Sequence, residues 1–183
     1  MDKKADVIGD TLFISASEKY GEKYIEHLLD QYRLYVNAAE KISDRRQKTN
    51  EFFLGLNTAL IGLLTFKLTN SGTEDTGMIL LIASVAGAVI CYLWYRIVVS
   101  YKGLNSAKYK VIHKIEERLP LALYDTEWEV LGRGKDKKKY WPFSHIEQFV
   151  PWIFIALYFI LFLSFIPWDI LDCLFGRLRD TLV

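Results

Sequence analysis

A glycine- and lysine-rich run, GRGKDKKK, at positions 132–139 contains residue types that could bind a ligand. A loop that cradles phosphate needs the pattern G-x-x-x-x-G-K-[ST] between a strand and a helix, and this run lacks both the spacing and the final hydroxyl residue. A basic cluster beside Tyr140 and Trp141 is more typical of contact with anionic lipid headgroups. We therefore predict a headgroup-binding cluster made of Lys135, Lys137, Lys138 and Lys139.

The histidines and cysteines do not form a catalytic or metal-binding motif in the sequence. His27, His113 and His145 are far apart and lack H-x-x-x-H or H-E-x-x-H spacing. Cys91 lies inside an apolar run, where a thiol packs as a small apolar group. No G-x-S-x-G or Cys/His signature is present either. The sequence therefore predicts a protein that is not an enzyme and that has no cofactor or metal site.

Apolar runs dominate the rest of the chain. The segments Thr76–Tyr95 and Gln148–Trp168 contain 20 and 21 residues without Asp, Glu, Lys or Arg. A helix of about 20 residues crosses a hydrocarbon core of about 30 Å, so both segments are long enough to span a bilayer. A third run, Phe52–Phe66, reaches this length if Lys67 snorkels and the helix extends to residue 73. The alternative for this third run is a re-entrant or interfacial helix.

Composition agrees with a membrane protein and excludes other classes. A hydrophobic content of 51% excludes a disordered chain, and two cysteines are too few for a disulfide scaffold. A net charge of +1 argues against binding nucleic acid by bulk electrostatics. We predict an all-α integral membrane protein with three transmembrane helices. The predicted segments are 1–51 (cytoplasmic N-terminal helical region), 52–73, 76–99 and 148–168 (transmembrane helices), 100–147 (cytoplasmic helical insert) and 169–183 (tail).

The distribution of basic residues predicts the orientation of these helices. Nine Lys and Arg residues precede the first span, and eleven lie between Arg96 and Gln148. The turn from Lys67 to Gly77 contains one, together with Glu74 and Asp75. Because basic loops stay on the cytoplasmic side, we place the N-terminus and the insert inside the cell and the short turn outside.

The N-terminal region contains a helical seam. Its apolar residues alternate in steps of three and four, and no Pro or Gly interrupts residues 22–54, so we expect one helix of over 40 residues that enters the bilayer. The seam packs either on its own chain or between subunits. Its members are Ile25, Leu28, Tyr32, Tyr35, Ala39 and Ile42.

The insert contains two further helices. Residues 104–120 have an apolar stripe that ends at Pro120, and this helix is expected to continue from the second span. A short helix is expected at Asp125–Leu131, ended by Gly132 and Gly134. Ser144 followed by Glu147 is a capping box that predicts the start of the third span.

Small and polar residues inside the spans indicate how the helices pack. Small side chains at helical spacing allow close approach of helices in lipid, and packing within one chain explains some of them. The predicted packing residues are Gly55, Ala59, Gly62, Ala83 and Gly87. Asn57 and Thr58 are strongly polar at membrane depth, and they are therefore the candidates for lining a pore.

Three stretches carry a resemblance to a known family: SDRRQKTNEFFLGLNTAL, LNSAKYKVIHKIEERLP and GRGKDKKKYWPFSHIEQFVPWIF. With the spacing of the spans, they resemble the RipA-like family of small bacterial inner-membrane proteins, an octameric membrane protein family. The resemblance covers residues 25–167. It implies a homo-oligomer, an octamer, in the bacterial cytoplasmic membrane, with a loose link to intracellular growth and stress adaptation. It implies no catalytic residue.

Together these patterns favour a non-enzymatic, homo-oligomeric membrane assembly with a structural, scaffolding or stress-adaptation role, in which the helices form a bundle. An alternative is an oligomeric channel or membrane-permeabilising effector gated by the cytoplasmic helices. A third hypothesis is a scaffold that recruits a soluble partner through residues 124–141. The expected partners are other copies of the chain, anionic lipid on the cytoplasmic side and such a soluble protein, but not nucleic acid.

Overall fold

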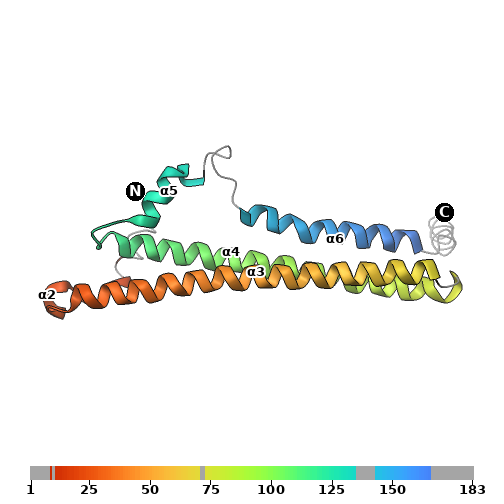
Figure 1. The fold of residues 1–183 in the computed structure, drawn as a ribbon, viewed down its shortest axis with the longest axis horizontal. Helices are drawn as coiled ribbons and strands as arrows, with labels where there is room; N and C mark the ends of the chain where they lie inside the picture. Colours follow the sequence, from red (N-terminus) through yellow and green to blue (C-terminus); the bar gives the residue numbers. More distant parts are fainter. Residues whose placement is uncertain (1–8, 10, 71–72, 135–142, 166–183) are drawn as a thin grey trace, which may run out of the picture. The chain divides into compact units, whose positions relative to one another are not determined.

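The computed structural model describes residues 9, 11–70, 73–134 and 143–165, and the regular structure in these ranges is helical. Polar side chains inside α3 are satisfied within the helix, because Thr49, Thr58 and Thr65 each donate a hydrogen bond to the carbonyl four residues earlier. The elements are α2 (Ser17–Tyr20), α3 (Tyr24–Asn70), α4 (Thr73–Glu116), α5 (Leu123–Val130), the 3-10 turn η1 (Gly132–Gly134) and α6 (Phe143–Phe165) (Figure 1).

Three of these helices, α3, α4 and α6, are long and apolar enough to cross a membrane. The expectation of one helix of over 40 residues before and through the first span is confirmed, because α3 has 47 residues without a break. At 1.5 Å per residue α3 is about 70 Å long, roughly twice what a bilayer core needs. Much of it therefore extends beyond the hydrocarbon.

The second span also continues as predicted. α4 runs from Thr73 through Gly103 to Glu116, and it ends before Pro120, which cannot continue a helix. The expected short helix is α5, which begins two residues earlier than predicted and ends at Val130. Gly132 and Gly134 stop it with φ angles of 68° and 70°, in the left-handed region that glycine adopts without steric cost.

The third span begins close to its predicted boundary. α6 starts at Phe143, one residue before Ser144, and its Pro151 is buried. The side chain of Ser144, and thus the predicted capping box, lies outside the described residues. The predicted tail, 169–183, lies outside them as well.

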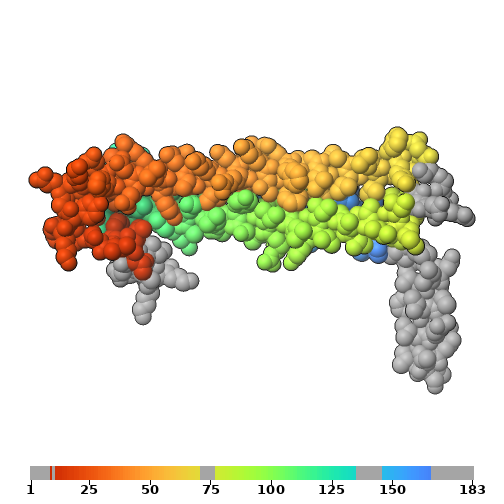
Figure 2. Space-filling view, turned by 90° about the horizontal axis from the view of Figure 1, so that it is seen from below, coloured from red at the N-terminus to blue at the C-terminus, as the bar shows by residue number. Residues whose placement is uncertain are grey.

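The chain divides into two compact units. The first contains the stretch of α3 up to Glu51, the stretch of α4 from Arg96 onward, α5 and η1. The second contains α3 from Phe52, α4 up to Tyr95 and α6 from Phe149. In both units α3 and α4 lie side by side and antiparallel (Figure 1, Figure 2). The second unit holds most of the apolar runs, and the first holds most of the charged residues.

Candidate functional site

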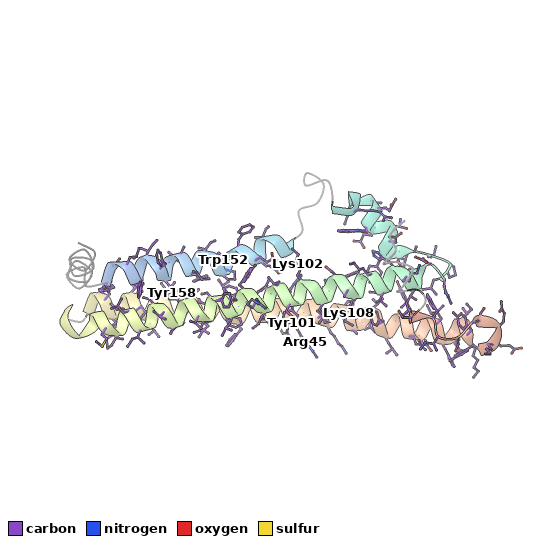
Figure 3. All side chains as sticks on the ribbon, turned by 180° about the vertical axis from the view of Figure 1, so that it is seen from behind. Arg45, Tyr101, Lys102, Lys108, Trp152 and Tyr158 are labelled. Atoms are coloured by element: carbon purple, nitrogen blue, oxygen red, sulfur yellow. The ribbon has the colours of Figure 1, made fainter. Side chains whose placement is uncertain are left out.

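Asn57 is the centre of a buried polar cluster in the second unit. Its side chain is fully buried, and its amide Oδ1 accepts hydrogen bonds from Cys91 Sγ and from Tyr158 Oη, each at 3.1 Å. Its Nδ2 donates to the carbonyl of Phe53 at 2.8 Å. One side chain of α3 therefore connects to α4 through Cys91 and to α6 through Tyr158. Figure 3 labels Tyr158 on α6.

Gly87 allows Tyr158 to reach this cluster. A Cβ atom built at Gly87 would overlap the ring of Tyr158, at a separation that real Cβ atoms essentially never show. Only glycine leaves room for the ring at this position. An aromatic layer packs beside the cluster, with Trp94 of α4 stacked on Phe53 at 5.8 Å and tilted against Phe154 at 6.1 Å.

The geometry of this cluster satisfies polar groups where water is absent. An unsatisfied hydrogen-bonding group in hydrocarbon costs several kcal/mol, so a buried amide must find partners on neighbouring helices. Asn57 thereby acts as a helix-joining residue. Thr58, its predicted companion, is exposed and bonds to Leu54 of its own helix. Within one chain, Asn57 faces other helices, which favours packing over the predicted pore-lining role.

Glu116 is the corresponding centre of the first unit. It is 1% exposed, and its Oε1 accepts a hydrogen bond from Tyr32 Oη at 2.8 Å. Oε1 also accepts from the backbone N–H of Tyr124 at 3.0 Å, and Oε2 from that of Asp125 at 3.1 Å. The first N–H groups of a helix have no partner within it, and Ala122, the residue before α5, provides no side-chain cap. The carboxylate of α4 therefore caps α5 and joins it to α3.

Tyr124, His113 and Asp125 provide further polar and charged groups near Glu116. Burial raises the pKa of the Tyr124 phenol, and the carboxylates of Glu40, Glu116 and Glu127 raise it further, so Tyr124 stays protonated. His113 Nδ1 lies 3.6 Å from a carboxylate oxygen of Asp125. The contacts around Glu116 serve to position α5 against α3 and α4.

Arg46 and Glu147 form a largely buried ion pair in the first unit. Arg46 Nε lies 3.3 Å from Glu147 Oε2. The pair links α3 to the start of α6, so Glu147, predicted as part of a capping box, contacts an arginine of another helix. Sequence spacing cannot reveal such a pair, because 101 residues separate its members.

The predicted seam residues are mostly covered within a single chain. Leu28, Ala39 and Ile42 are buried, while Ile25 is exposed. Tyr32 binds Glu116, and the ring of Tyr35 lies 4.3 Å below the ammonium group of Lys108. These contacts favour packing on the same chain, the first of the two alternatives for this seam.

The predicted small packing residues separate into two groups. Gly87 packs tightly within the chain, and Ala83 is half-buried. Gly55, Ala59 and Gly62 are exposed, and nothing lies within 4 Å of a Cβ built at either glycine. The predicted headgroup cluster, Lys135, Lys137, Lys138 and Lys139, lies outside the described residues.

Glu116 is a structural centre that was not predicted from the sequence. It stands among charged residues in HKIEERLP, where a solvated side chain is expected. Its position next to Ile115 and four residues after Ile112, both buried on the apolar stripe, was the available signal. In the described ranges, no group of three or more His, Cys, Asp or Glu side chains could hold a metal ion.

The fold indicates the class: the described residues form helices, and three of these helices are long and apolar enough to cross a membrane. The chain matches the model of the octameric membrane protein family (8xMP) over residues 29–167, and it belongs to that family. The family resemblance noted in the sequence is thus confirmed. Comparison with curated proteins and with solved structures finds no match.

The substitution Asn57→Leu tests the membrane cluster. It keeps the branched shape and the number of side-chain heavy atoms but leaves Cys91 and Tyr158 without their acceptor, so we expect a loss of about 1–2 kcal/mol in the free energy of unfolding. Unfolding in mixed micelles, followed by circular dichroism, measures this loss. The matched control is Thr58→Val, which removes an exposed hydroxyl and should change stability by less than about 0.5 kcal/mol. Equal effects of both changes would contradict the role of Asn57.

The substitution Gly87→Val tests the close approach of α4 and α6. The added side chain overlaps the Tyr158 ring, and overpacking of this kind costs about 1–3 kcal/mol. The same micelle titration provides the measurement. Gly103→Ala on the same helix is the control, since that site is open and alanine favours helix by up to about 1 kcal/mol. A Gly87 variant as stable as the wild type would disprove the contact.

The substitution Glu116→Gln tests the cap of α5. A neutral amide has one acceptor oxygen, so at least one of the three donors loses its partner, and we expect a loss of about 1–3 kcal/mol. Hydrogen exchange should become faster at the amides of Tyr124 and Asp125. The neighbouring change Glu117→Gln alters an exposed side chain that pairs with Lys114 and should leave that exchange unaltered. Unchanged protection in Glu116→Gln would refute the cap.

Proposed function

We propose that this chain assembles into a homo-octamer in the bacterial cytoplasmic membrane, as a non-enzymatic scaffold with its N-terminus inside the cell. The family to which it belongs is described as octameric. The observation that carries the proposal is an unpartnered face of small residues on α3 in the second unit. In each unit the buried polar groups hydrogen-bond to one another and join helices, which is typical of a structural role.

The small-residue face of α3 suits contact with a neighbouring subunit. Phe52 and Phe66 are 63% and 67% exposed and mark its two ends. Between them lie the exposed Gly55, Ala59 and Gly62, and the five residues are spaced alternately three and four positions apart, so they share one side of the helix. In lipid, close approach of backbones replaces the hydrophobic effect as the force that associates helices, and small residues permit it. We term this surface the α3 face.

The outward side of α4 provides a second, different surface. Five apolar residues of α4 are spaced alternately four and three positions apart, and each side chain is at least half exposed. The three in the middle are β-branched. Such side chains have few rotamers to lose when they pack into a shallow face. We term this surface the α4 face, and its residues are Met78, Ile82, Val85, Val89 and Tyr92.

A closed ring of eight subunits requires two different faces. In cyclic assemblies of more than two subunits each contact is heterologous, so one surface of a subunit meets another surface of the next. The α3 face is shallow and the α4 face projects, so they are complementary in shape. α6 instead exposes large aromatic side chains, among them Phe149, Trp152 and Phe159, which suit contact with lipid.

The first unit supports the scaffold role and the orientation. The basic residues concentrate in its segments, which favours the cytoplasmic side. Its α5 region exposes Leu121, Leu123 and Val130, each by more than 60%, and apolar side chains in water favour a binding partner. This surface is where the scaffold would recruit a soluble protein.

The substitution Ala59→Leu tests the assembly. A larger side chain at the centre of the α3 face holds two helices apart, and a cost of about 1–3 kcal/mol per interface lowers the octamer population at least about tenfold. Native mass spectrometry in mild detergent counts the subunits. The control is Ala156→Leu, the same change at an exposed position of α6, which should leave octamers intact.

Two outcomes of this experiment would contradict the proposal. A monomeric wild-type particle would reject the octamer itself. Octamers that survive Ala59→Leu but dissociate in Ala156→Leu would reject the α3 face as the contact and place α6 in the interface.

A further inference from the structure

The stretch of the first unit nearest in sequence to the apolar runs is strongly basic. From Arg96 to Ile115, α4 contains five basic residues and no Asp or Glu. The stretch 41–51 of α3 adds four basic residues against two acidic ones, Asp44 and Glu51. The net positive charge of these two stretches is larger than the net charge of +1 for the whole chain. This part of the first unit therefore attracts anions.

Several of these basic side chains already have partners within the chain. Arg46 pairs with Glu147, Lys108 lies over the ring of Tyr35, and Lys114 pairs with Glu117 at 2.7 Å. The carboxylate of Glu51 accepts a hydrogen bond from Gln47. Four basic side chains closer to the apolar runs are exposed or half-buried, and we term them the inner basic belt. They are Arg45 and Lys48 of α3 and Arg96 and Lys102 of α4, and Lys102 also has a contact within the chain.

The four residues of the belt lie at one level along the paired helices. α3 and α4 are antiparallel, and Tyr32 meets Glu116 while Tyr35 meets Lys108. Continuing this pairing along α3 brings Arg45 and Lys48 level with the stretch of α4 between Arg96 and Lys102. Figure 3 labels Arg45, Tyr101 and Lys102 at the same level of the two helices.

This level corresponds to the headgroup layer. Lys48 precedes Phe52 by four residues, Arg96 directly follows Tyr95, and Lys102 lies six residues further on. At 1.5 Å per residue, these positions are within about 10 Å of the ends of the apolar runs. The polar layer on each side of a bilayer is about 5–8 Å thick, and long basic side chains extend into it. Tyr101, half-buried at the same level, is a residue type enriched there.

We propose that the inner basic belt binds the phosphate group of an anionic phospholipid in the cytoplasmic leaflet. The guanidinium groups of Arg45 and Arg96 can bind phosphate oxygens through two parallel hydrogen bonds, and the ammonium groups of Lys48 and Lys102 add point charges. The inference rests on the proposed orientation, and it is independent of the subunit number. It assigns lipid binding to the helices themselves, separately from the lysine cluster at 135–139.

The test uses the full chain in mild detergent, titrated with dioleoyl phosphatidylglycerol and observed by native mass spectrometry. The variants are Arg45→Gln/Lys48→Gln and Arg96→Gln/Lys102→Gln. At about 1 kcal/mol per basic residue, each double variant should bind this lipid roughly 30-fold more weakly. The control, Lys19→Gln/Lys23→Gln, removes the same charge from exposed positions that precede α3 and should bind normally. The start of α3 lies about 40 Å along the helix from Phe52.

Four results would overturn the proposal. The first is unchanged binding of phosphatidylglycerol in both belt variants, and the second is equal binding of dioleoyl phosphatidylcholine by the wild type. The third is equal weakening in the control, which would indicate bulk charge. Inorganic phosphate at the same concentration should not displace the lipid, and displacement would assign the site to free phosphate. The same spectra report subunit number, so a monomer that still binds phosphatidylglycerol would reject the octamer but not the belt.

Discussion

The absence of water from the bilayer is the constraint on which the second unit depends. A polar side chain at that depth must be satisfied by protein, and Asn57 is satisfied by one partner on each of three helices. The amide therefore specifies which faces of α3, α4 and α6 meet. Apolar packing alone specifies this weakly, because lipid is as apolar as the side chains. Gly87 then determines how closely Tyr158 can approach.

The first unit solves a related problem in a different way. Glu116 is a buried carboxylate, and its charge is balanced by hydrogen-bond donors from Tyr32 and from the start of α5. A short helix of eight residues has little stability of its own, so this connection holds α5 in place. Both units thus use one buried polar side chain to join three helices, an amide in the more apolar unit and a carboxylate in the more charged one.

These internal connections also determine what remains for assembly. The polar cluster and Gly87 occupy the inner sides of the three helices, which leaves the α3 face and the α4 face uncovered in a single chain. The small residues therefore fall into two groups, and their spacing does not distinguish them. Gly87 serves packing within the chain, whereas Gly55 and Gly62 have no neighbour within 4 Å of a Cβ built at either position.

The sequence by itself determined the helical class, the three apolar helices and the unbroken length of α3 and α4, because these follow from local periodicity, run length and the positions of Pro and Gly. It also indicated that Asn57 matters, since a strongly polar residue in an apolar run is conspicuous. Only the tertiary structure decided that Asn57 binds Cys91 and Tyr158 and that Glu116 caps α5. Those partners are 34, 101 and 8 residues away, and helix packing, which no local pattern encodes, brings them together.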